Sequence, residues 1–229
     1  MSDLSNRVAL VTGASVGIGR AVALRLAEAG AFVGVHFNTG KTEAEETLGI
    51  IHEAGGDGML LQADLGNAEQ ATGLVNQLVS QTEQLDILIN NAGALLQRVK
   101  IEDCPLENWE KTLAVNLTGS FLVTQKAIPH LKASGNGAII NNLSLSVQTG
   151  GANGAGPYAI AKGGLQVMTR TLARELAPEV RTNAIMPGVI ETRHHERFTT
   201  PERMEEYRKE TPMDRNGLPD EVADTVLFL

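Results

Sequence analysis

The chain has 229 residues, of which 42% are hydrophobic and 20% charged, and its formal net charge is −8. This length suits a single α/β domain spanning residues 1–229, which would remove roughly 70% of the unfolded chain's surface from water. The negative charge leaves no basic surface for neutralising phosphates, so we expect neither a nucleic acid nor an anionic membrane as a partner. The expected partner is a small molecule.

The single cysteine and the first residues bear on the compartment. Cys104 cannot form an internal disulfide and has no Cys or His neighbour at a metal-ligand spacing, so we expect no metal site and a reducing environment. The chain start lacks the basic and apolar regions of a secretion signal, and no run reaches the roughly 18 apolar residues of a membrane helix. These features predict a cytoplasmic protein.

Short apolar runs alternate with longer amphipathic segments from the first residues onward. This order predicts a doubly wound parallel sheet covered by helices on both faces, a Rossmann-type three-layer α/β/α fold. We expect strands at 7–11, 31–37, 58–62, 85–90, 137–143 and 180–186. We expect helices at 17–29, 41–53, 68–82 and 106–131 and from Tyr158 to about 177, with loops at 93–105 and before Tyr158.

The segment 189–216 differs from the rest of the chain because it is polar, charged and irregular. Such a segment is typical of a mobile lid over a binding site. Arg193, His194 and His195 lie in this segment, and we expect their side chains to be solvated.

A glycine-rich turn follows the first expected strand and opens the first expected helix. Its sequence is Thr12-Gly13-Ala14-Ser15-Val16-Gly17-Ile18-Gly19. Glycines allow a tight turn and let backbone N–H groups approach a pyrophosphate at the helix N-terminus, where the helix dipole favours negative charge. A phosphate-hydrolysing P-loop would need Gly-Lys-Ser/Thr where this chain has Gly19-Arg20-Ala21. The turn therefore predicts dinucleotide binding.

The end of the second strand bears on the choice of dinucleotide. NAD-binding folds place an acidic residue there for the ribose hydroxyls, whereas NADP needs its absence or a nearby cation. Here the strand ends His36-Phe37-Asn38, and Lys41 follows. The absent carboxylate and Lys41 favour NADP, while Val16, which stands where a basic residue would strengthen a phosphate site, keeps NAD as the alternative.

Tyr158 and Lys162 lie four residues apart, which places both side chains on one face of a helix. A free phenol titrates near ~10, so acid/base work near neutrality requires stabilisation of the phenolate. A lysine ammonium beside the phenol provides part of this stabilisation. The spacing alone is common, and it gains weight only from the motifs around it.

Several spaced motifs agree in their order along the chain: Thr12-Gly13-x3-Gly17-Ile18-Gly19, Asn90-Asn91-Ala92-Gly93, Asn116, Ser144, Tyr158-x3-Lys162 and Pro187-Gly188. In this order they resemble the short-chain dehydrogenases/reductases over essentially the whole chain. The branch resembles the 3-oxoacyl carrier-protein reductases and glucose dehydrogenases. The resemblance implies an oxidoreductase that moves a hydride between a nicotinamide dinucleotide and a carbonyl or alcohol carbon.

The same resemblance implies a catalytic group of four residues. Tyr158 would protonate the carbonyl oxygen or take the hydroxyl proton, and Ser144 would hydrogen-bond that oxygen. Lys162 would lower the Tyr158 pKa and bind the nicotinamide ribose, and Asn116 would hold a water linked to Lys162. Ser146 points to the same side of an extended strand as Ser144. We favour Ser144 and leave open whether Ser146 shares its role.

The resemblance also implies where the cofactor lies. Besides Tyr158 and Lys162, the expected contacts are Gly13, Ser15, Val16, Gly17, Ile18, Gly19, Asn38, Lys41, Asp64, Leu65, Asn91, Ala92, Gly93, Pro187, Gly188, Ile190 and Thr192. Asp64 would meet the adenine amine, and Ile190 and Thr192 would reach the nicotinamide carboxamide.

Three further expectations come from the family. Its members usually continue beyond Phe228-Leu229 with a final strand, which we expect to be missing here. They form homo-oligomers, and we expect a tetramer or dimer built on the helices at 106–131 and 158–177. Ala177-Pro178-Glu179 offers no basic surface for an acidic carrier protein, so a free small substrate is favoured.

Two other functions remain alternatives to an NADP-dependent carbonyl reductase. One is an NAD-dependent sugar or polyol dehydrogenase. The other is a dinucleotide-binding sensor without turnover, against which the intact Asn116, Ser144, Tyr158 and Lys162 argue.

Overall fold

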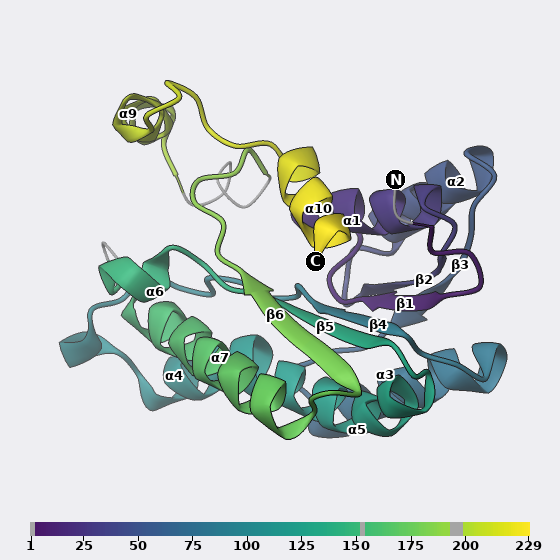
Figure 1. Cartoon of the computed structure of the whole chain (residues 1–229). Helices are drawn as coiled ribbons and strands as arrows, with labels where there is room; N and C mark the ends of the chain where they lie inside the picture. Colours follow the sequence, from purple (N-terminus) through teal and green to yellow (C-terminus); the bar gives the residue numbers. More distant parts are fainter. Residues whose placement is uncertain (1–2, 152–153, 193–198) are drawn as a thin grey trace.

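The computed structural model describes residues 3–151, 154–192 and 199–229 (Figure 1). Its strands are β1 (Val8–Val11), β2 (Phe32–Phe37), β3 (Asp57–Gln62), β4 (Ile87–Asn90), β5 (Gly137–Asn142) and β6 (Val180–Ile185). Its α-helices are α1 (Gly17–Glu28), α2 (Lys41–Glu53), α3 (Ala68–Thr82), α4 (Leu106–Leu113), α5 (Gly119–Ala133), α6 (Ser146–Thr149), α7 (Gly156–Glu175), α9 (Pro201–Glu210) and α10 (Pro219–Phe228).

The six strands form one parallel sheet in the order β3-β2-β1-β4-β5-β6. The chain runs outward from β1 to β3 and then returns to place β4 on the other side of β1. In folds of this kind, ligands bind at the carboxyl ends of the strands on either side of such a reversal, here β1 and β4. The predicted doubly wound Rossmann-type fold is confirmed.

Helices cover both faces of the sheet, as Figure 1 shows, with α1, α2 and α10 on one side and α3, α5 and α7 on the other. On the first face Leu26 of α1 and Val226 of α10 join one apolar core with strand residues such as Val33. On the second face Leu78 of α3 and Val123 of α5 join another. Strands that are covered by helices on both faces need apolar side chains on both faces, so they appear in the sequence as continuous apolar runs.

The long helix expected at 106–131 is wrong as a single α-helix. It is divided into α4, a π-helical turn at Ala114–Thr118, and α5, which continues to Ala133. The side chain of Asn116 in that turn donates to the carbonyl oxygens of Thr112 (2.9 Å) and Ala94 (3.0 Å). A π-turn shifts the helix register by one residue, and such turns are frequent at functional sites.

The two expected loops contain short helical segments. A 3₁₀ turn, Ile101–Asp103, interrupts the loop at 93–105, and α6 lies in the segment before Tyr158. The expected lid at 189–216 is not wholly irregular either, because it contains α9. Thr200 caps α9 by accepting a hydrogen bond from the Arg203 N–H (3.3 Å), and Pro201 occupies its first turn.

The two ends of the lid segment are joined in parallel pairing at Ile190 and Gly217. The Glu191 N–H donates to the Gly217 carbonyl (2.9 Å), and the Gly217 N–H donates to the Val189 carbonyl (2.9 Å). Backbone hydrogen bonds therefore hold the two ends of the lid segment together. Arg193, His194 and His195 lie outside the described residues.

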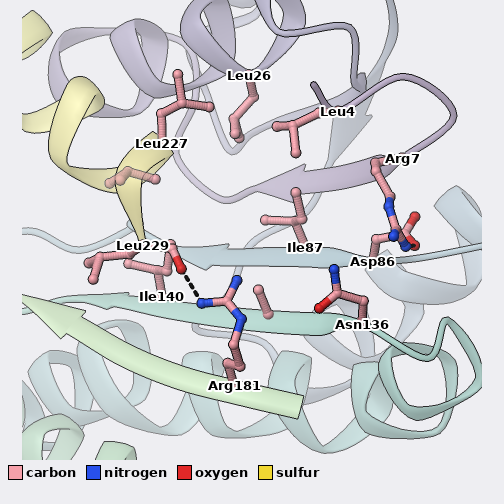
Figure 2. Close-up of a pocket in the computed structure, with 12 residues that line it drawn as sticks. Leu4, Arg7, Leu26, Asp86, Ile87, Asn136, Ile140, Arg181, Leu227 and Leu229 are labelled. Atoms are coloured by element: carbon pink, nitrogen blue, oxygen red, sulfur yellow. Dashed lines mark hydrogen bonds and ion pairs between the residues drawn. The ribbon is translucent and has the colours of Figure 1, made fainter. Parts of the chain in front are cut away.

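A pocket lies between the sheet and the helices α1 and α10 (Figure 2). Apolar side chains such as Leu26, Ile140 and Leu227 line it, and Arg7 and Asp86 lie at one end. Arg7 and Asp86 precede the first residues of β1 and β4, so this pocket is at the amino ends of the strands. It is at the opposite edge of the sheet from the one where folds of this kind bind their ligands.

Candidate active site

Most of the predicted site residues gather at the carboxyl ends of the six strands. The glycine turn follows β1, Asn38 follows β2, Asp64 and Leu65 follow β3, Asn91 to Gly93 follow β4, and Ser144 follows β5. Pro187 and Gly188 follow β6. Because parallel strands end at one edge of a sheet, residues distant in sequence meet there.

The glycine turn depends on the absence of side chains at particular positions. Gly13 and Gly17 have φ angles of +64° and +58°, which residues with a side chain rarely adopt. A Cβ atom on Gly19 would lie 2.1 Å from the Gly13 carbonyl oxygen, so only glycine fits there. Val16 precedes α1 without capping it through a side chain. The first N–H groups of α1 are therefore left uncovered by a cap at the position suited to a pyrophosphate.

Asn91 and Thr12 hold the glycine turn against the loop after β4. The Asn91 side-chain amide donates to the carbonyl oxygens of Thr12 (2.9 Å) and Gly13 (3.1 Å). In return the Thr12 hydroxyl oxygen accepts from the backbone N–H groups of Asn91 (2.9 Å) and Ala92 (3.0 Å). The two segments expected to line the dinucleotide are thus fixed to each other.

His36 of β2 also holds the turn, and the sequence interpretation treated it only as a strand residue. It is 2% exposed, and its Nδ1 accepts a hydrogen bond from the Gly13 N–H at 3.0 Å. Nδ1 is therefore unprotonated, so Nε2 carries the hydrogen and donates it to the Ala63 carbonyl at 3.0 Å. Burial lowers the pKa of His36 to about 4, against a smaller opposing effect of the Ala63 hydrogen bond.

Lys162 is almost completely buried, at 2% exposure, and its Nζ donates to the Asn142 carbonyl at 2.6 Å. The Asn142 side-chain amide donates in turn to Oδ1 of Asn91 at 2.9 Å. Lys162 is therefore connected to the glycine turn through two asparagines. Burial lowers the pKa of Lys162 to about 8, because an ammonium loses its hydration in the interior.

Asn116 lies beside Lys162 and the loop after β4. It is fully buried, and its Oδ1 accepts from the Ala94 N–H at 2.9 Å. A Cβ on Gly93 would lie 2.7 Å from Asn116 Oδ1 and 3.0 Å from Lys162 Nζ. The backbone at Gly93 therefore runs against both side chains, and the structure brings together three residues that the sequence placed in one site.

Tyr158 lies in the first turn of α7 and is partly buried. Burial raises its pKa, and a hydrogen bond from Ser144 opposes that rise. The Lys162 Nζ lies 5.9 Å from the centre of the Tyr158 ring, and the residues of the protein alone keep the phenol protonated near neutral pH. A protonated phenol is the form that donates a proton to a developing alkoxide.

The residues expected around the adenosine lie at the ends of β2 and β3. Asn38 and Lys41 are exposed, and Lys41 forms an ion pair with Glu45 (3.6 Å). Arg20 of α1 is engaged with the Ser15 carbonyl (2.9 Å) and with groups of α2. Asp64 uses its carboxylate to accept from the Gly66 N–H (2.8 Å). Lys41 is thus an exposed cation at the end of β2.

The segment after β6 lies against the glycine turn. A Cβ on Gly17 would lie 3.2 Å from Cγ2 of Thr192, so Thr192 borders the turn as expected for a cofactor contact. The Pro187 carbonyl accepts from the Leu145 N–H at 3.1 Å, which joins this segment to the one carrying Ser144. Ile190 is buried at the base of the lid segment.

Together the fold and this edge of the sheet define a dinucleotide-dependent oxidoreductase. A family model described as Enoyl-(Acyl carrier protein) reductase matches residues 13–229. A 3-oxoacyl-[acyl-carrier-protein] reductase from Synechocystis is 37% identical, with all of this chain and 91% of that protein covered.

Two solved structures agree in fold and sequence. An NADH-dependent reductase, A1-R′, responsible for alginate metabolism, is 32% identical with a TM-score of 0.90, covering 100% of this chain and 90% of that one. The reductase LugOII, which catalyses keto-reduction in lugdunomycin biosynthesis, is 34% identical with a TM-score of 0.90, covering 99% and 91%. The chain belongs to the short-chain dehydrogenase/reductase family, and it is an oxidoreductase that uses a nicotinamide dinucleotide.

Within the described residues, no helix combines the length and apolar character needed to cross a bilayer. The same residues contain no cluster of three or more His, Cys, Asp or Glu side chains arranged for a metal ion.

Proposed function

We propose that this protein is an NADP(H)-dependent carbonyl reductase for a free small-molecule substrate, with Tyr158 as the general acid/base. The observation that carries the proposal is the convergence of Tyr158, Ser144, Lys162 and Asn116 at the strand edge where the glycine turn lies. The known reductases among its relatives support the reaction type.

In the reducing direction the substrate oxygen lies between Ser144 and Tyr158. Ser144 donates a hydrogen bond to this oxygen, and Tyr158 transfers its phenolic proton to it as the carbonyl becomes an alcohol. When bound, the nicotinamide supplies the hydride that the carbonyl carbon receives. The buried Lys162 stabilises the resulting phenolate electrostatically, and Asn116 holds a water through which the proton is replaced.

The cofactor would lie along the residues that the sequence nominated. The turn from Gly13 to Gly19, with Ser15, Val16 and Ile18, would hold the pyrophosphate, and Asp64 and Leu65 would border the adenine. Asn91, Ala92 and Gly93 would line the ribose, and Pro187, Gly188, Ile190 and Thr192 would border the nicotinamide. Two features support this arrangement: the first N–H groups of α1 have no side-chain cap, and the approach to the turn is free of side chains at Gly13, Gly17 and Gly19.

NADP is proposed over NAD because the end of β2 carries Asn38, where NAD-binding folds place a carboxylate, and Lys41 follows it. NAD remains the second candidate for two reasons. Arg20 is already committed to α2 and to the Ser15 carbonyl, and one solved relative is an NADH-dependent reductase.

The domain organisation, the location and the oligomeric state are also proposals. We propose one domain over residues 1–229 with a lid at about 189–216, a cytoplasmic location, and a homo-oligomer of two or four chains. Exposed apolar side chains on α4, α5 and α7 support the last of these.

The test is a Tyr158→Phe variant assayed with NADPH and NADH against a panel of ketones, sugars, oxo-esters and acyl thioesters. Removing the proton donor should lower kcat by about 10³-fold and leave dinucleotide affinity within about twofold, because Phe keeps the packing. Cofactor binding is followed by nicotinamide fluorescence. Unchanged turnover in Tyr158→Phe would overturn the mechanism, and tighter binding of NADH than NADPH would reverse the cofactor preference.

A further inference from the structure

The hydroxyl of Ser144 is held by a second serine that follows it by two residues. Ser146, the first residue of α6, donates from its hydroxyl to Ser144 Oγ at 2.9 Å. The Ser146 backbone N–H donates to the same oxygen at 3.2 Å. Figure 1 shows α6 beside the end of α7 that carries Tyr158. Ser144 therefore accepts two hydrogen bonds from one neighbour.

Two accepted hydrogen bonds determine what the Ser144 hydroxyl can still do. A serine oxygen has two acceptor lone pairs and one proton. Ser146 occupies both lone pairs, so the Ser144 proton is the group that remains available on that oxygen. A hydrogen bond from Ser144 lowers the Tyr158 pKa against the effect of burial, which is the effect expected of a donor to the phenolic oxygen.

This matters because a serine and a tyrosine side by side can hydrogen-bond in two directions. If Tyr158 donates to Ser144, the phenolic proton is engaged by the serine and withheld from the substrate. If Ser144 donates, the Tyr158 proton stays free for the substrate oxygen, and Ser144 can donate to the same oxygen. The second arrangement is the productive one for general acid catalysis.

We propose that Ser146 is a positioning residue that makes Ser144 an obligate hydrogen-bond donor toward the reacting oxygen. The proposal rests on the proposed function above, because it assigns Ser146 a role in that same reaction. Ser146 acts through Ser144 and does not itself contact the substrate.

The local backbone does not depend on the Ser146 hydroxyl. The turn into α6 is closed by the Val147 N–H donating to the Ser144 carbonyl (3.0 Å) and the Gln148 N–H donating to the Leu145 carbonyl (2.9 Å). Ser146→Ala should therefore fold like the wild type. It keeps the backbone N–H contact and loses only the hydroxyl, so one lone pair of Ser144 becomes available to Tyr158.

The experiment compares Ser146→Ala, Ser146→Cys and Ser146→Thr, with Thr149→Ala at the exposed end of α6 as the matched control. We expect kcat to fall about tenfold in Ser146→Ala, less in Ser146→Cys because a thiol is a weak donor, and little in Ser146→Thr. The KM for the dinucleotide should not change. In the oxidising direction, the apparent pKa of kcat/KM should rise in Ser146→Ala, because the phenolate loses a fixed donor.

A double-mutant cycle with Ser144→Ala separates this role from a merely structural one. If Ser146 acts through Ser144, adding Ser146→Ala to Ser144→Ala should lower kcat by less than twofold further. An equal tenfold loss in both backgrounds, or an unchanged kcat and pH profile in Ser146→Ala, would overturn the proposal. An active Tyr158→Phe would instead reject the proposed function itself, so the two failures are distinguishable.

Discussion

A single imidazole connects the ends of three neighbouring strands at the cofactor edge. His36 of β2 accepts from Gly13 after β1 and donates to Ala63 after β3. Only the neutral imidazole can make both hydrogen bonds, because a proton on Nδ1 would point at the Gly13 N–H. Burial explains why its pKa falls to about 4, because the interior disfavours the charged imidazolium, and the Ala63 hydrogen bond opposes this fall only in part.

This pKa predicts a pH dependence of stability. An unfolded histidine titrates near ~6.5, so between pH 6.5 and 4 the unfolded chain binds more protons than the folded one, and stability falls as pH falls. The shift of roughly 2.5 units corresponds to about 3 kcal/mol of unfolding free energy. His36→Asn keeps an acceptor near Gly13 and cannot titrate. It should be less stable than the wild type at pH 7 and should lose less stability on acidification.

Urea unfolding at intervals from pH 7 to 4.5 measures this difference directly. The control is His52→Asn, because His52 lies on the exposed side of α2 and should leave the wild-type slope intact. Parallel curves for the wild type and His36→Asn would show that His36 does not control the acid sensitivity.

At the residue scale, the sequence could nominate candidate reacting groups and not the residues that hold them. Tyr158, Lys162 and Ser144 were nominated because they occur in a series of motifs whose order resembles that of the short-chain dehydrogenases/reductases. His36 and Asn142 stand in strands, where an alternating or apolar pattern gives no sign that a polar side chain is buried and hydrogen-bonded. Their roles depend on strand neighbours that only the order of the sheet defines.

At the scale of elements, the glycine turn is the segment with the narrowest steric tolerance. A Cβ on Gly19 would lie 2.1 Å from the Gly13 carbonyl oxygen and 2.5 Å from Asn91 Nδ2. Gly19→Ala must therefore displace the turn and separate it from the loop after β4. We expect a loss of about 2 kcal/mol in unfolding free energy and at least a tenfold weaker dinucleotide affinity.

Gly73 in the interior of α3 is the matched control, because nothing lies within 4 Å of a Cβ placed there. Gly73→Ala should stabilise the protein by about 0.5–1 kcal/mol through helix propensity and leave cofactor binding unchanged. Denaturant unfolding and nicotinamide fluorescence titration of both variants check the pair. Wild-type dinucleotide affinity in Gly19→Ala would contradict the assignment of the turn.

The bounds of a helix could be predicted where one apolar periodicity extends through the whole helix. The bounds of α2 and α3 agree with those expected, because each has a regular apolar stripe between clear ends. The π-turn at Ala114–Thr118 was missed because it includes Asn116, whose side chain bonds to Ala94, and the sequence gives no sign of this contact over 22 residues. Helix α9 was missed because most of its residues are charged and none of them is buried, so it has no apolar stripe.

At the scale of the whole molecule, one helical layer exposes apolar side chains. Leu106 of α4, Phe121 of α5, and Ile160 and Val167 of α7 are 68%, 44%, 48% and 60% exposed. These helices lie on the same side of the sheet in Figure 1. Exposed apolar groups gathered on one layer are characteristic of a surface that associates with another chain.

The proposed homo-oligomer therefore predicts the effect of a charge in this layer. Val167→Glu should shift the protein from a dimer or tetramer to a smaller species, because a carboxylate buried at an interface without a partner costs several kcal/mol. Light scattering coupled to size-exclusion chromatography measures the mass. Ile50→Glu is the control, since Ile50 is 42% exposed on α2, on the opposite face of the sheet, and its substitution should leave the mass unchanged. A wild-type protein that is already monomeric would contradict the proposed homo-oligomer. A Val167→Glu variant of unchanged mass would show that the association surface lies elsewhere.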